Sequence, residues 1–300
     1  MFYRVFITLI TIIFVSCNGC VDSGKNPIEE SLNTKDSQTP VVGTEEMGDV
    51  IDNIGSPVEW ANMIKQNGVQ FSKKYLAPTD NIDDLNTQFR QALALGILGA
   101  DLGYLNMYSR TSSILQYISS IKELSDELKI GQFFDFETLK RLSTNNENLD
   151  SLTYISVSSF NKMDKYLRER NRGNVSALIV SGLWLEGIYL ATQVTKEIPN
   201  AKISERIGEQ KIVLGLLVLI LNNYSKDPVF KEFSDYFNKI YEELKKVDIT
   251  YKVGEPKSIV KNGIMTIEQT EESIVKITPE QLKSITIIVE QTRNKLVNAK

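Results

Sequence analysis

LGILGADLGYLNMY, residues 95–108, decides the fold that we predict for this chain of 300 residues. Apolar and small residues recur here and just upstream at spacings of three and four: Leu85, Phe89, Ala92, Leu93, Gly96 and Ala100. This spacing indicates a helix with one buried face. Each glycine costs such a helix about 1 kcal/mol relative to alanine, so we expect the glycines to allow a close approach between helices. A phosphate-binding loop would need a strand before the glycines, and these lie inside the helix.

Two further apolar stretches resemble membrane spans at first sight. One runs from Ala177 to Ala191 and is interrupted by Glu186, and the other, Ile212 to Leu221, is ten residues long. Neither reaches the roughly 20 apolar residues that a spanning helix needs. We therefore expect two central helices that are buried on nearly all sides of a bundle.

The remaining helices are marked by their start signals. Ser56-Pro57, Asp227-Pro228 and Thr278-Pro279 each place a capping residue before a proline at the first helical position. Between and beyond these signals, the periodicity predicts helices over residues 112–129, 134–144, 148–171, 174–197, 203–225, 228–246 and 279–298.

One region breaks the helical pattern. Lys257 to Thr270 holds Asn262-Gly263 between two β-rich runs, which is a strong hairpin signal. Ile249 to Val253 and Ser273 to Ile277 could add a third and a fourth strand. The predicted fold class is mainly α: a multi-helix bundle of antiparallel helix pairs with a small β-hairpin or meander inserted before the C-terminal helix. We expect a helical domain over residues 56–248, with the β insertion and last helix (249–300) packed on it.

The N-terminus has the organisation of a targeting segment. Arg4 precedes Val5 to Val15, an apolar run of signal-peptide length that is too short to span a bilayer. Val15-Ser16-Cys17 resembles the lipobox of bacterial lipoproteins, although Phe14 stands where leucine is usual. We predict a signal peptide over residues 1–16 and lipid attachment, as by palmitate, at Cys17. A plain signal peptide or a retained anchor is the alternative.

Cys20 completes a Cys-x-x-Cys spacing with Cys17. A redox role would require a strand–helix context, and no strand is predicted before it. The composition then changes: from Asp22 to Asp52 there are eight acidic residues, opposed only by Lys25 and Lys35. Such a segment buries too little apolar surface to offset its ordering entropy. Residues 17–55 are therefore predicted to be a lipidated cysteine followed by a flexible acidic tether.

Composition excludes several functions. The chain is 42% hydrophobic and 24% charged, as ordinary globular proteins are, and its net charge of −4 argues against a nucleic-acid partner. It has no histidine, which excludes Ser-His-Asp machinery and histidine-based zinc or di-iron sites. Both cysteines lie near the N-terminus, so the body has no thiolate metal site. We expect no metal and no cofactor, while chemistry by a pair of carboxylates remains open.

The candidate site residues come from an internal similarity. Residues 98–105 align with residues 183–190 so that Asp101 and Tyr104 coincide with Glu186 and Tyr189. Residues three apart share a helix face, and both acids have apolar neighbours one turn away. One hypothesis is an inward carboxylate pair that forms a ligand or cation site. The other is that each acid accepts hydrogen bonds from a tyrosine, an arginine or a backbone amide and fixes helix register.

LGILGADLGYLNMY (95–108), GQFFDFETLKRLSTN (131–145) and SGLWLEGIYLATQV (181–194) also resemble a group of uncharacterised helical lipoproteins from Bacteroidota-type bacteria. The resemblance implies a helical architecture and an outer-membrane location, on either face, and no catalytic activity. We therefore expect a non-enzymatic envelope lipoprotein, anchored through Cys17, that binds an envelope protein partner or acts as an accessory or scaffold subunit. The alternative is a small-ligand binder or a carboxylate-based enzyme centred on Asp101 and Glu186.

Overall fold

The computed structural model describes residues 57–80, 82–143, 149–254, 257–261, 264–268 and 271–298. Its helices are α3 (Pro57–Gln66), α4 (Gln88–Met107), α5 (Thr111–Glu127), α6 (Phe136–Ser143), α7 (Leu149–Glu169), α8 (Gly173–Glu197), α9 (Ala201–Asn223), α10 (Pro228–Leu244) and α11 (Pro279–Val297). The predicted signal peptide, Cys17, the tether, the Ser56 cap and the Asn262-Gly263 turn lie outside the described residues.

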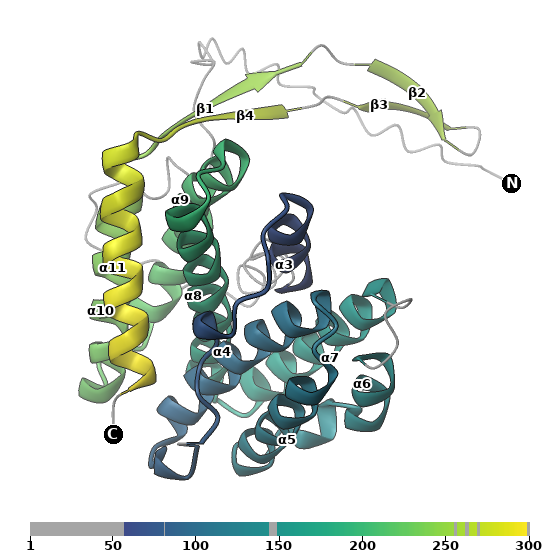
Figure 1. Ribbon diagram of the computed structural model, residues 1–300, viewed down its shortest axis with the longest axis vertical. Coiled ribbons are helices and arrows are strands. Elements are labelled where there is room, and N and C mark those ends of the chain that lie inside the picture. Colours follow the sequence, from purple (N-terminus) through teal and green to yellow (C-terminus); the bar gives the residue numbers. More distant parts are fainter. Residues whose placement is uncertain are drawn as a thin grey trace, which may run out of the picture.

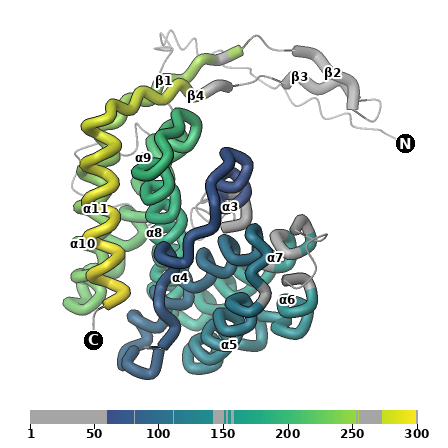
Figure 2. Tube along the Cα trace, in the orientation of Figure 1, coloured from purple at the N-terminus to yellow at the C-terminus, as the bar shows by residue number. Residues whose placement is uncertain are grey.

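The described chain is a helical bundle with a small antiparallel β element before its last helix, so the predicted fold class is confirmed (Figure 1). Helices α4 and α8 form its centre. Helix α4 packs against α3, α5 and α8, and α8 also packs against α7, α9 and α11. Figure 2 shows the chain passing from α5, α6 and α7 on one side to α10 and α11 on the other.

The crossing of α4 and α8 depends on two glycines. A Cβ atom at Gly96 would lie 2.0 Å from the carbonyl oxygen of Ile179, and a Cβ atom at Gly182 would lie 2.1 Å from that of Leu93. Real Cβ atoms do not come this close to backbone, so the two helices meet main chain to main chain. The predicted close approach is confirmed for Gly96, whereas at Gly99 the nearest atom, Leu183 Cδ1, is 3.6 Å away.

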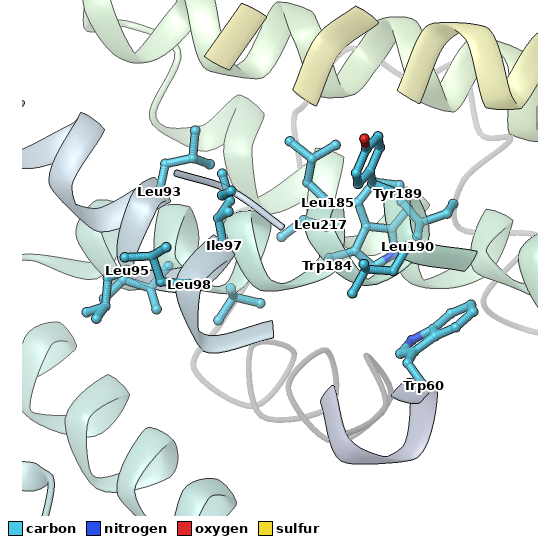
Figure 3. Packing of buried hydrophobic residues seen from close by; sticks show 14 of the residues in the cluster. Trp60, Leu93, Leu95, Ile97, Leu98, Trp184, Leu185, Tyr189, Leu190 and Leu217 are labelled. Carbon is cyan, nitrogen blue, oxygen red and sulfur yellow. The ribbon is translucent and has the colours of Figure 1, made fainter. Parts of the chain in front are cut away.

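Helix α8 is the core of the bundle. Among the described residues, it is the one helix long and apolar enough to cross a membrane, but 94% of its apolar window is buried inside the protein. Figure 3 shows its Trp184, Leu185 and Leu190 in one cluster with Trp60 of α3 and Leu217 of α9. The length and composition of α8 are thus those of a helix surrounded by other helices, as its sequence predicts.

The helix caps form where the sequence places them. The Asp227 side chain accepts hydrogen bonds from the backbone N–H groups of Val229 and Phe230 at the start of α10. At the start of α11, Thr278 and Gln281 cap each other through both side chains, which makes a complete capping box.

The strands form two antiparallel pairs. Strand β1 (Asp248–Val253) pairs with β4 (Glu271–Lys276), and β2 (Lys257–Lys261) pairs with β3 (Ile264–Glu268). The β1–β4 pair leaves the bundle where α11 begins (Figure 1). It is attached to α9: a Cβ at Gly208 would lie 2.5 Å from Val275 Cγ1, and the Ser273 hydroxyl donates to Glu209 at 2.9 Å.

Candidate functional site

The two acids singled out by the sequence meet inside the bundle. Asp101 on α4 and Glu186 on α8 are both fully buried, at 0% exposure. Arg293, from the last turns of α11, donates from Nε to Glu186 Oε2 at 3.0 Å and from Nη2 to Glu186 Oε1 at 2.8 Å. The same Nη2 donates to the carbonyl oxygen of Tyr75 at 3.1 Å. We call Asp101, Glu186 and Arg293 the acid cluster.

Asp101 is held differently from Glu186. Its Oδ2 accepts the backbone N–H of Ala77 at 2.8 Å, and its Oδ1 is buried without a donor from the described part of the chain. Burial raises the pKa of the Asp101 carboxyl well above its usual range, and the negative charge of Glu186 raises it further, against the opposing charge of Arg293. The raised pKa favours the protonated form of Asp101, and in that form the acid cluster carries no net charge.

Tyr104 and Tyr189, the tyrosines of the internal similarity, contact residues other than the two acids. The Tyr104 hydroxyl accepts the backbone N–H of Ser72 at 3.0 Å, and its ring stacks on Phe71 with 5.5 Å between centroids. The Tyr189 ring faces the guanidinium of Arg293 at 4.4 Å, which is a cation–π contact. Of the three donor types considered from the sequence, an arginine and a backbone amide hold the acids through the hydrogen bonds that the structure shows.

The arrangement combines features of the two hypotheses for Asp101 and Glu186, a ligand site and a structural role in fixing helix register. The two carboxylates share one niche, as a ligand site would require, but the niche is sealed from solvent. Neither acid lines the two hollows described below. Within the described ranges, no group of three or more carboxylates is placed to hold a metal ion. The geometry is that of a buried polar tie between α4, α8 and α11.

Arg293 is the residue that sequence reasoning missed. It stands four positions after Val289 and eight after Ile285, both at 0% exposure, so it continues the buried face of α11. An arginine at an apolar helix position is a sign of a buried acid elsewhere in the fold. That spacing could have identified Arg293 as inward-facing, but not which acid it meets.

Two hollows adjoin α11. The first, which we call the loop pocket, has a volume of about 80 Å³ and lies between the α3–α4 segment, α4, α10 and the end of α11. The second, the α11 groove, is an open groove of about 950 Å³ between the end of α8, the start of α9, the end of β4 and the first half of α11. The loop pocket is lined mainly by apolar side chains, whereas the α11 groove has both apolar and polar or charged residues in its lining.

The raised pKa of Asp101 has a consequence for stability. Because its folded-state pKa is raised, the unfolded chain releases a proton that the folded chain keeps once the pH exceeds the unfolded-state value of about 4. Stability therefore falls as the pH rises toward the folded-state pKa. Asp101→Asn keeps an acceptor for Ala77 and removes this titration. We expect the variant to gain stability relative to the wild type as pH is raised from 4 to 7 in urea-unfolding curves. A pH-independent difference between the two proteins would show that Asp101 is ionised in the fold.

Comparison with family models, with curated proteins and with solved structures finds no match to this chain.

Proposed function

We propose that the protein is a lipid-anchored cell-envelope protein of the bacterial outer membrane, whose helical body binds a protein partner and is itself non-catalytic. The observation that carries the proposal is the sealed acid cluster. Asp101 and Glu186, the pair of carboxylates that the sequence offers for chemistry, are at 0% exposure and are engaged by Ala77 and Arg293. The lipobox at Cys17 and the acidic segment after it support the anchored location.

The α11 groove supports a partner-binding role. Ile287 lines it and is 44% exposed, and Ile198, next to the lining residue Pro199, is also 44% exposed. Exposed apolar surface that is gathered in a groove marks an interaction site more often than scattered single residues do.

The charges of the α11 groove indicate the chemistry of the partner. Lys276 and Lys283 stand on its β4 and α11 walls without an ion pair in the described part of the chain. Lys196 and Glu290, also in the lining, pair with each other at 3.0 Å. Glu205 is a second lining acid, so the five charged side chains leave a net charge of +1. The apolar residues and the net positive charge of the lining together suit an extended protein segment that carries both apolar and acidic residues.

A carboxylate enzyme or small-ligand binder centred directly on Asp101 and Glu186 is the less favoured function. A catalytic carboxyl group must reach its substrate within hydrogen-bond distance. Burial of both acids behind α4, α8 and α11 opposes this, because a substrate would have to separate the central helices.

Site-specific photocrosslinking in native membranes tests the proposal. A photoreactive residue at position 287 in the α11 groove should give one crosslinked envelope protein, while one at position 115 should not; Leu115, on α5, is a matched control at 41% exposure. Lys276→Glu with Lys283→Glu should abolish the product, and Cys17→Ser should release the chain from the membrane. Equal crosslinking from positions 287 and 115, or a product that survives both charge reversals, would contradict a specific partner. A chain that stays membrane-bound as Cys17→Ser would contradict the lipid anchor alone.

A further inference from the structure

We propose that the outer edge of β4 pairs with the same edge of a second copy of this chain. Each copy contributes its β1–β4 pair, which we call the ribbon, and the two ribbons join into one four-stranded sheet. The contact is symmetric, with a twofold axis at Ile274. It does not rest on the partner proposed for the α11 groove, although Lys276 belongs to both surfaces.

The outer edge of β4 is an open sheet edge. Within the described ranges, β4 pairs only with β1, and no backbone hydrogen bond joins its other side to another element. The ribbon runs outward from the start of α11 (Figure 1). An open edge presents a row of unpaired N–H and C=O groups, and two strands alone make a sheet of marginal stability. Pairing the two edges satisfies the backbone groups of both copies.

One face of the ribbon is exposed and has an apolar residue at its centre. The exposed residues of this face are Ile274 and Lys276 of β4 and Asp248, Thr250 and Lys252 of β1. Ile274 is 43% exposed, whereas Val275, on the opposite face, packs on α9 at Gly208. A single exposed apolar side chain is common on protein surfaces, so the charges around Ile274 are what indicate its partner.

The sequence of β4 is complementary to itself in the antiparallel direction. In EESIVK (271–276), Glu272 and Lys276 stand two positions before and two positions after Ile274. A register centred on Ile274 places Ile274 opposite its own copy, and Glu272 of each copy opposite Lys276 of the other. Opposite charges directly across two strands stabilise a sheet, and like charges destabilise it. The twofold axis forms both charge pairs at once.

The charges of β1 continue this pattern. Lys252 is in register with Glu272, and Asp248 is in register with Lys276. Across the joined sheet, each row of charges therefore alternates in sign over four strands. Glu272 and Lys276 each stand beside one opposite charge in their own ribbon and a second one in the other copy, so neither has to give up a neighbour.

The outer edge of β1 is less suited to the same contact. Asp248 and Lys252 have the same symmetric placement about Thr250, but threonine does not supply a large apolar side chain at the centre. The paired Ile274 side chains would bury apolar surface that is exposed in the single copy. The experiment therefore compares positions 274 and 250.

Disulfide trapping at the twofold axis tests the proposal. The six residues of β4 are far fewer than the roughly 20–30 a side of a standard interface, so we expect a reversible contact that a covalent bond can capture. The protein is the full chain with Cys17→Ser and Cys20→Ser, which removes both native thiols. With Ile274→Cys added, mild oxidation should give a disulfide-linked dimer on a non-reducing gel.

Thr250→Cys in the same background is the matched control. Thr250 is exposed on the same face and is in register with Ile274. In the proposed sheet its two copies stand three strand spacings apart, about 14 Å, whereas a disulfide needs Cα atoms within about 7 Å. Directly opposite residues, as at position 274, have Cα atoms about 4.5–5.5 Å apart. The dimer should therefore form at least tenfold faster from position 274 than from position 250.

Charge reversal tests the register. In the Ile274→Cys protein, Glu272→Lys or Lys276→Glu sets like charges opposite each other, so each should slow dimer formation at least fivefold. When the two variants are mixed, with an affinity tag on one, each supplies the charge that the other lacks. The mixed dimer should then form at least fivefold faster than either homodimer. Lys283→Glu, in the α11 groove but outside β4, is the control and should leave the rate unchanged.

Far-ultraviolet circular dichroism checks that each variant is folded. The proposal is overturned if folded Ile274→Cys protein forms no disulfide dimer, or if Thr250→Cys protein forms one as fast. It is also overturned if the single charge reversals do not slow the dimer, if mixing them restores nothing, or if Lys283→Glu slows it as much as Lys276→Glu does. None of these outcomes bears on photocrosslinking of an envelope partner from position 287, so the two proposals fail separately.

Discussion

Replacing Arg293 by methionine is expected to lower the free energy of unfolding by about 3–5 kcal/mol. Methionine fills most of the space of the arginine stem, so the loss is mainly electrostatic. Glu186, at 0% exposure, would keep its place without the two hydrogen bonds from Arg293, and the Tyr75 carbonyl would lose its donor. Urea unfolding at pH 7, followed by far-ultraviolet circular dichroism, measures the change.

The control for this variant is an ion pair of the same type on the surface. Lys231 and Asp235 pair at 2.6 Å on α10, with side chains 57% and 51% exposed. Solvent screens such pairs, so Lys231→Met should shift the urea midpoint hardly at all. If Lys231→Met and Arg293→Met shifted the midpoint equally, burial would not be the source of the effect.

Replacing Gly96 by alanine is expected to cost about 3 kcal/mol or more, although alanine is the better helix former. The new methyl group would lie 2.0 Å from the carbonyl oxygen of Ile179, which belongs to the backbone of α8 and cannot rotate away. Helices α4 and α8 would have to separate, which opens the core around the acid cluster. Overpacking of this kind usually costs about 1–3 kcal/mol, and a backbone-to-backbone contact stands at the upper end. The midpoint of urea unfolding reports the loss.

Gly99, on the same helix, is the matched control. A methyl group there would meet Leu183 Cδ1 at 3.6 Å, an ordinary van der Waals distance. Gly99→Ala should therefore gain up to about 1 kcal/mol from helix propensity alone. Opposite signs for the two substitutions are the expected result. A stabilised Gly96→Ala protein would mean that α4 and α8 do not cross at Gly96 and Gly182.

Much of the fold could be predicted because its signals are local. The proline-led start signals at Asp227 and Thr278 form real caps, since a cap needs only the residues of its own first turn. The apolar composition of α8 required a helix covered on every side. Gly96 indicated close packing because a glycine inside an otherwise apolar helix has few other roles.

The candidate site was predicted in part, and the limit is sequence distance. Asp101 and Glu186 were identified as inward-facing from their helix neighbours, and they are fully buried. The partner of Glu186 lies 107 residues away on α11, and no spacing rule connects the two. Ala77 holds Asp101 through its backbone N–H group, so the residue type at position 77 gives no sign of this contact.

The two tyrosines show that a shared helix face does not determine which residues the side chains contact. Tyr104 and Tyr189 share a face with their acids, but a tyrosine ring extends well beyond its own turn. Tyr104 reaches Ser72, and Tyr189 lies against Arg293. The loop pocket was not predicted either. Leu85 continues the apolar spacing of α4 in the sequence, but α4 begins at Gln88, so Leu85 lines the pocket from the segment before the helix.

A double-mutant cycle on Glu186 and Arg293 tests most directly whether the acid cluster is a structural tie. Four proteins are unfolded in urea at pH 7: the wild type, Glu186→Gln, Arg293→Met and the double variant. Arg293→Met should be costly because Glu186 loses its buried cation, and Glu186→Gln because Arg293 loses its two hydrogen bonds to a carboxylate. The double variant should recover much of the loss, with a coupling free energy of about 2 kcal/mol or more, since the neutral amide of Glu186→Gln needs no countercharge. Losses that simply add, with the double variant the least stable of the four, would contradict a sealed and mutually compensated cluster.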